Sequence, residues 1–230
     1  TSEEIRNFIV GKFIEIGPNL HDVDSYIQRR FLLQTPDVQP LSFDELLSHT
    51  SNERLKILVE DQRAGKSTFF VKAAYDLKQK YPHKWVVLID FKSIKELKLH
   101  ENMSIGKVRR FLTKDVQKLS ELNLKIFNDL FDAGNAIILW DSIDEYSVEI
   151  ILNIIKTLEV STTIQQWLAC GVEHKNKLKK YFTQKSFKFS EYSENEQKRL
   201  MMNFILKQKL KRNVRSAILD INNDMKLFQS

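Results

Sequence analysis

The sequence predicts an α/β fold, in which a parallel β-sheet is covered by helices on both faces. From Leu55 onward, short apolar runs typical of buried strands alternate with longer stretches of helical spacing. Glycine and proline are scarce, with six and four residues in 230, which disfavours a sandwich or barrel built on many tight turns. Strands that are joined by helices form right-handed crossovers and therefore lie parallel.

Residues 1–50 are predicted to form an N-terminal helical and linker segment. A helix is expected over Ser2 to Ile16, where apolar residues recur at helical spacing. Prolines within Gly17 to Pro40 indicate irregular linker structure. Ser42-Phe43-Asp44-Glu45 then resembles a capping box that opens a short helix through Leu47.

Residues 51–190 are predicted to form the core domain. Its five strands are expected at Leu55–Val59, Trp85–Ile89, Ala136–Trp140, Ile164–Ala169 and Phe187–Phe189. Its helices are expected at Ser67–Gln79, Ser104–Val116, Leu119–Phe131 and Val148–Leu158, with Ala133-Gly134 as a C-cap signal. From Glu191 onward only helix signals remain, so residues 191–230 are predicted to begin a C-terminal helical subdomain.

Composition narrows the classes of protein to which the chain can belong. The hydrophobic content of 42% and charged content of 29% are those of a soluble globular protein. No stretch approaches the ~18 uninterrupted apolar residues of a membrane span. The single cysteine, Cys170, excludes an internal disulfide framework and favours a reducing compartment, so we expect a cytoplasmic location. Because the chain begins with Thr1 rather than Met, we expect a piece of a longer protein.

The net charge of +6 is concentrated near the C-terminus. Between Lys175 and Arg215 there are thirteen Lys and Arg residues against three acidic ones. Such a surface can contact nucleic acid or an anionic membrane surface. The alternative is a solvated, lysine-rich helical surface, and no aromatic residues interleave with the charges in the way that stacks bases.

The strongest chemical signal is Gly65-Lys66-Ser67-Thr68, directly after a strand and directly before a helix. Backbone N–H groups at a helix N-terminus point at phosphates, and the helix dipole favours their charge. Lys66 would reach the β- and γ-phosphates, and the Ser67 hydroxyl would bind Mg²⁺. The predicted nucleotide-binding residues are Arg63, Ala64, Gly65, Lys66, Ser67 and Thr68.

This motif departs from the pattern G-x-x-x-x-G-K-[ST] at its first glycine. Glu60 stands in that position, and we expect its carboxylate to repel phosphate oxygens, an effect that Arg63 would partly offset. The alternative interpretation of Gly-Lys-Ser-Thr is an ordinary helix start.

An acidic strand end supplies the second signal. Asp141 ends an apolar run, and Asp144 and Glu145 follow three residues later. An Asp at a strand end of this kind positions Mg²⁺, and a following acid orients or deprotonates the attacking water. The predicted metal ligands are therefore Ser67 and Asp141, and the predicted catalytic residues are Asp144 and Glu145. The alternative is an acidic loop that caps the helix near Val148.

Asp141-Ser142-Ile143-Asp144-Glu145 resembles the Walker B element of NACHT-type STAND ATPases. Weaker similarities to the same family lie upstream, in Tyr26 to Phe31, and downstream, in Gln166 to Leu168. The resemblance implies a three-layer P-loop NTPase with strand order 5-1-4-3-2, an ATP or ADP ligand with Mg²⁺, and control of oligomerisation in immune or death signalling. In place of the family's Thr-Thr/Ser-Arg-Pro this chain has Ala169-Cys170-Gly171-Val172, so slow hydrolysis or binding without turnover is expected.

These observations predict a nucleotide-controlled switch that associates with itself or with other domains of a longer chain. Two alternatives stay open: a NACHT-like interaction scaffold without catalysis, and a nucleic-acid-dependent ATPase that uses the basic C-terminal region. No Asn-Lys-x-Asp motif for guanine is present, which favours adenine.

Overall fold

The structure, a computed structural model, describes residues 26–33, 39–91, 103–117, 119–141, 143, 148–184, 186–203 and 205–206. The chain divides into two compact units, Thr1–Ser190 and Glu191–Ser230. The predicted helix at Ser2 to Ile16 lies outside the described residues. In the second unit residues 194–203 are helical, and their start is a capping box, with Ser193 N–H donating to Glu196 Oε2 at 2.8 Å and Glu196 N–H donating to Ser193 Oγ at 3.4 Å.

The first unit is built on a six-stranded sheet with the order β1-β6-β2-β5-β4-β3. The strands are β1 (Phe31–Leu33), β2 (Leu55–Val59), β3 (Trp85–Asp90), β4 (Ala136–Asp141), β5 (Gln165–Cys170) and β6 (Ser186–Phe189). All neighbouring strands are parallel except β1, which pairs antiparallel with β6. The sequence-based prediction placed each of β2 to β6 to within one residue at either end.

The expected order 5-1-4-3-2 and the expectation of a wholly parallel sheet need one correction, which is β1. When the five predicted strands are numbered along the chain, their positions relative to one another follow that order, as β6-β2-β5-β4-β3. The sixth strand lies where irregular linker was predicted. Phe31 exchanges backbone hydrogen bonds of 2.8 Å with Leu41. The centroid of its ring lies 5.0 Å from that of Phe69 and 5.7 Å from that of Phe187. This short segment is a strand because its backbone pairs with the edge of β6 and the Phe31 ring packs in an aromatic cluster.

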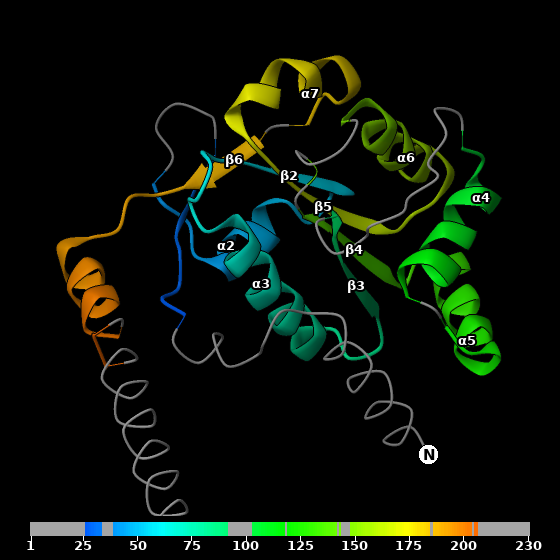
Figure 1. Cartoon of the computed structure of the whole chain (residues 1–230), viewed down its shortest axis with the longest axis horizontal. Helices are drawn as coiled ribbons and strands as arrows, with labels where there is room; N and C mark the ends of the chain where they lie inside the picture. Colours follow the sequence, from blue (N-terminus) through cyan, green and yellow to red (C-terminus); the bar gives the residue numbers. More distant parts are fainter. Residues whose placement is uncertain are drawn as a thin grey trace, which may run out of the picture. The chain divides into compact units, whose positions relative to one another are not determined.

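Helices cover both faces of the sheet, as expected for an α/β fold (Figure 1). On one face lie α2 (Phe43–His49) and α3 (Lys66–Lys80). On the other lie α4 (Ile105–Arg110) with the π-helical Phe111–Val116, α5 (Glu121–Asp132), α6 (Val148–Ser161) and α7 (Lys175–Tyr181), which a 3₁₀ turn at Val172–His174 precedes. Trp85, Trp140 and Trp167, which lie on β3, β4 and β5, are all buried.

Two helix ends follow their predicted signals. Ser42 and Glu45 form the expected capping box at the start of α2. Gly134 follows the C-cap of α5 with φ of 72°, and its N–H donates to Phe131 O at 3.1 Å while Asn135 N–H donates to Leu130 O at 2.7 Å. This pair of bonds is a Schellman motif, which a glycine in the left-handed region allows.

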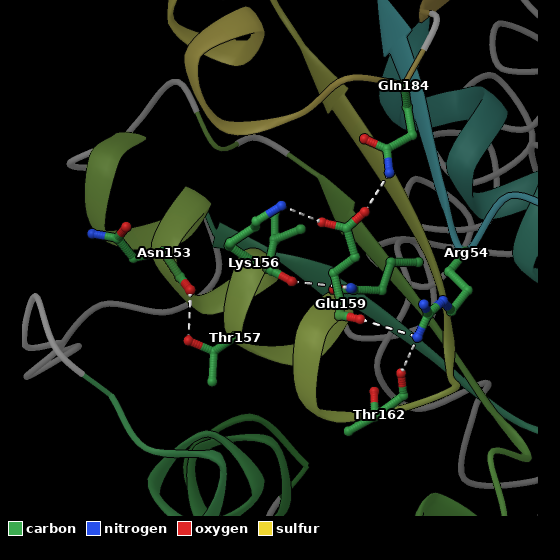
Figure 2. A network of polar contacts seen from close by, with 9 residues as sticks. Arg54, Asn153, Lys156, Thr157, Glu159, Thr162 and Gln184 are labelled. Atoms are coloured by element: carbon green, nitrogen blue, oxygen red, sulfur yellow. Dashed lines mark hydrogen bonds and ion pairs between the residues drawn. The ribbon is translucent and has the colours of Figure 1, made fainter.

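The C-terminal end of α6 is held by a side chain from outside the helix (Figure 2). Arg54 Nη1, just before β2, donates to Thr162 O at 2.8 Å and to Glu159 O at 3.2 Å. The Glu159 carboxylate in turn accepts hydrogen bonds from Lys156, at 3.1 Å, and from Gln184. Because a cation near exposed helix carbonyls is favourable, this network fixes α6 against the start of β2.

Replacing Arg54 with alanine is expected to lower the free energy of unfolding by about 1–2 kcal/mol, because two helix-end carbonyls lose a charged donor. Urea denaturation of the wild type and the Arg54→Ala variant measures this difference. Arg54→Lys keeps the charge but not the Nη1 that makes both hydrogen bonds, so it should retain part of the stability. An unchanged urea midpoint for Arg54→Ala would show that the network has no stabilising role.

Lys56 is a buried cation on β2, with only 2% of its surface exposed. Its Nζ donates to Glu53 O at 2.7 Å and lies 5.6 Å from the centroid of the Trp167 ring. Burial lowers the pKa of Lys56 from 10.5 to about 8, although the nearby Glu53 carboxylate opposes this effect. Between these two values the unfolded chain holds a proton that the folded chain lacks.

The free energy of unfolding should therefore rise as pH increases from about 8 to 10.5, by at most ~3 kcal/mol from Lys56. Lys56→Met, which keeps the volume without the titrating group, should lose this rise. Denaturation curves at several pH values for both proteins isolate the contribution, because the remaining titrating groups are common to them. Equal pH dependence in the two proteins would contradict the assignment.

Candidate functional site

The carboxyl ends of the parallel strands meet at one edge of the sheet. The register pairs Val59 of β2 with Cys170 of β5, and Asp90 of β3 with Asp141 of β4. After β2 the chain enters α3 on one face, whereas after β4 and β5 it enters α6 and α7 on the opposite face. In open α/β sheets ligands bind where successive connections diverge to opposite faces, and here that point lies between β2 and β5.

The loop of residues 60–65 joins β2 to α3 at this point. Arg63 has φ of 65° and Gly65 has φ of 90°, while Ala64 between them has negative φ. Ala64 N–H closes a turn onto Asp61 O at 3.3 Å. Alternation of left- and right-handed residues turns consecutive N–H groups toward one side, which forms a concavity that binds anions.

Gly65 is also the N-cap of α3, and no side chain caps the helix start. Glycine is needed there because side chains rarely adopt a φ of 90°. The first turn of α3 contains no acidic residue, and it consists of Lys66, Ser67 and Thr68. The N–H groups and the positive end of this 15-residue helix are therefore available to an anion.

The side chain of Lys66 lies across the loop. Its Nζ donates to Glu60 O at 3.1 Å and to Asp61 O at 2.9 Å. A cation held by backbone carbonyls of this loop can exchange these neutral partners for phosphate oxygens, to which its hydrogen bonds would be charge-assisted.

Glu60 does not lie as the sequence suggested. Its carboxylate accepts the hydrogen bond of Phe189 N–H, at the end of β6, and its own N–H donates to Cys170 O at 3.1 Å. The carboxylate is thus engaged with β6, which lies beside β2, and the expected clash with a phosphate does not follow from this arrangement.

Asp141 ends β4 at the same edge and is 4% exposed. One strand, β5, separates β4 from β2, so the two strand axes are roughly 10 Å apart. The predicted catalytic residues Asp144 and Glu145, and Ser142 beside them, lie outside the described residues. Ile143, which follows the strand, is fully buried.

Two acidic residues at this edge were not singled out from the sequence. Asp90 ends β3 directly opposite Asp141, and its signal was the same: an apolar run closed by an acid. Glu173 places its carboxylate over Gly171 at the end of β5, where an added Cβ would lie 2.1 Å from its Oε1. This carboxylate therefore lies beside the position where the resembled family carries an arginine, and His174 Nε2 is 3.8 Å from its Oε1.

Neither a scan against protein-family models nor a search of curated proteins finds a match to this chain. Along the part of the chain that the structure describes, no helix is long and apolar enough to cross a membrane.

Proposed function

We propose that this chain is the nucleotide-binding switch domain of a NACHT-type STAND protein, which holds ATP or ADP with Mg²⁺ and changes its self-association with the bound nucleotide. The observation that carries the proposal is the 60–65 loop. Within it Arg63 and Gly65 have positive φ on either side of Ala64, Gly65 lies at the N-terminus of a long helix, and the Lys66 ammonium donates to the backbone carbonyls of Glu60 and Asp61. A loop of this kind, with N–H groups and a lysine at the divergence point of a parallel sheet, suits a chain of phosphates.

In this proposal backbone N–H groups of Ala64 to Thr68 hold the phosphates, and Lys66 neutralises their terminal charge. The Ser67 hydroxyl and the Asp141 carboxylate are the protein ligands of Mg²⁺. No three His, Cys, Asp or Glu side chains gather into a metal site within the described ranges. Phosphate oxygens and water would then complete the Mg²⁺ shell, as they commonly do.

Hydrolysis is proposed to be slow. Asp144 and Glu145 are the residues that the resemblance assigns to activation of water. At the end of β5, however, Gly171 offers no side-chain donor, and the Glu173 carboxylate lies over it. A negative charge in place of an arginine would disfavour the charge that develops in phosphoryl transfer. The chain is therefore proposed to hold its nucleotide for long periods rather than to turn it over rapidly.

Thermal unfolding of the protein with and without Mg²⁺-ATP or Mg²⁺-ADP tests the proposal. At a nucleotide concentration about 100 times Kd, binding should add about 2.7 kcal/mol to the free energy of unfolding. Removal of Mg²⁺ with a chelator should reduce the shift, since Asp141 would then repel the phosphates. A folded protein whose unfolding temperature responds to neither nucleotide would overturn the proposal.

The carboxylate over Gly171 also favours a second candidate, a NACHT-like scaffold that binds no nucleotide and acts through its surface. The thermal experiment separates the two, because a scaffold would show no shift with either nucleotide.

A nucleic-acid-dependent ATPase is the third candidate, and α7 is the observation that favours it. Lys175, Lys177, Lys179 and Lys180 lie on this helix, although Lys177 pairs with Glu149 at 2.8 Å. Binding of DNA or RNA through these lysines should weaken steeply with salt, in proportion to the number of phosphate contacts. Salt-independent or undetectable binding would exclude this candidate.

A further inference from the structure

The residue that replaces the first glycine of the phosphate-binding pattern is also the residue that joins the 60–65 loop to β6. Phe189, the last residue of β6, donates its N–H to the Glu60 carboxylate. One residue later, the first compact unit ends at Ser190. We propose that this hydrogen bond, the Glu60 latch, couples nucleotide binding to the anchoring of Phe189 at the end of β6. The inference rests on the proposed function.

The far end of β6 is held from several directions at once. Ser190 N–H donates to Arg30 O at 2.8 Å, and the Phe189 ring lies 5.5 Å from the Phe69 ring. The Arg29 guanidinium carbon stands 4.3 Å from the centroid of the Phe189 ring. Phe69 belongs to the first turns of α3, which begins at Lys66. A displacement of Phe189 would therefore change its contacts with two elements: the 60–65 loop, through Glu60, and α3, through Phe69.

The charge of Glu60 gives the latch its effect on binding. While Phe189 N–H holds it, the carboxylate is occupied by a partner on the β6 side of the loop. Once released, the same anion is free to turn toward the loop whose N–H groups and lysine would bind phosphate. A carboxylate a few ångströms from a phosphate repels it, and it competes for the same donors. Glu60 is thus a positioning residue whose placement sets the affinity for nucleotide.

Coupling of this kind is reciprocal. If an anchored Phe189 strengthens nucleotide binding, then bound nucleotide must stabilise the anchored Phe189 by the same free energy. A glycine at position 60 would break the coupling in both directions, because it offers neither an acceptor to Phe189 nor a competing charge.

A double-mutant cycle measures the coupling. It compares the dissociation constants for Mg²⁺-ADP of the Phe189 variants with and without Glu60, each determined by isothermal titration calorimetry. Phe189→Pro removes the N–H donor, whereas Phe189→Ala removes the ring but keeps the donor and serves as the packing control. With Glu60 present, Phe189→Pro should bind ADP roughly tenfold more weakly than Phe189→Ala, which corresponds to a released charge near phosphate. In the Glu60→Gly background, the two variants should bind ADP equally.

Hydrogen exchange provides a readout that needs neither proline substitution nor turnover. In the wild type, exchange of the peptide containing Phe189 should slow further when ADP binds. Glu60→Gln, which keeps an acceptor oxygen without the charge, should preserve much of the protection found without nucleotide. Glu60→Gly should lose that protection and should show no further slowing with ADP.

The outcomes separate the latch from the function on which it rests. If the wild type binds ADP but Phe189→Pro weakens binding equally with Glu60 and with Gly at position 60, the latch is wrong and the nucleotide site stands. The same holds if exchange at Phe189 is unaffected by Glu60→Gly. If the folded wild type binds neither ADP nor ATP, the proposed function fails and the latch fails with it.

Discussion

Replacing Lys66 with alanine is expected to weaken the binding of Mg²⁺-ADP and Mg²⁺-ATP by roughly a hundredfold, the largest effect that we expect on function. The ammonium now donates to Glu60 O and Asp61 O across the loop. Its exchange for phosphate oxygens would form charge-assisted hydrogen bonds, each of which contributes about 1.5–3 kcal/mol. Losing about 2.7 kcal/mol of binding free energy corresponds to a hundredfold rise in Kd.

Calorimetric titration of the wild type and the Lys66→Ala variant measures this change, with Lys125→Ala as the matched control. Lys125 is an exposed lysine of α5, on the opposite face of the sheet from α3, so its removal alters net charge equally without touching the loop. The control should bind nucleotide as the wild type does. Unchanged affinity in Lys66→Ala would place the nucleotide away from the 60–65 loop.

Phe31→Ala is expected to destabilise the first unit by about 3–5 kcal/mol, the range typical of a buried phenylalanine reduced to alanine. Phe31 is 1% exposed, and its ring contacts Phe43 at 6.2 Å, Phe69 at 5.0 Å and Phe189 at 5.8 Å. Removing the ring leaves a cavity among side chains that come from α2, α3 and β6. These elements cannot close around it without moving the sheet.

Urea denaturation measures this loss, and Leu122→Ala on α5 is the control. Leu122 is 65% exposed, so its truncation should change stability by no more than about 0.5 kcal/mol. A loss below about 1 kcal/mol in Phe31→Ala would mean that β1 is not part of the core. The segment would then be the linker that the sequence suggested.

The core strands and helices could be predicted because their patterns are local. Each of β2 to β5 has five or six residues, most of them apolar, which is long enough to be recognised without knowledge of its neighbours. Gly134 and the Ser42 capping box were likewise readable, since a helix end requires particular residues at fixed offsets. Strand β1 could not be predicted from the sequence, because three residues show no periodicity. In addition, Phe31 pairs with Phe189, which lies far along the chain.

The site was predictable in its residue types but not in its interactions. In the sequence, Gly65-Lys66 stands between a strand and a helix, which already predicts a lysine close to the N–H groups of the loop. In the structure the Lys66 side chain does contact this loop, through its hydrogen bond to Asp61 O. The partner of the Glu60 carboxylate was not predicted, because Phe189 N–H comes from a strand that only folding brings alongside β2. Glu173 was overlooked because its approach to Gly171 depends on the turn after β5.

The sequence by itself determined the α/β class, the strands β2 to β6 and the motif around Lys66, because each depends on residues that are close together in the chain. Only the tertiary structure decided that β1 completes the sheet and that the Glu60 carboxylate accepts a hydrogen bond from β6. It alone also decided that Asp90 and Asp141 lie opposite each other at the ends of neighbouring strands. These arrangements are long-range: hydrogen bonds and strand register join segments whose separation in sequence carries no local pattern.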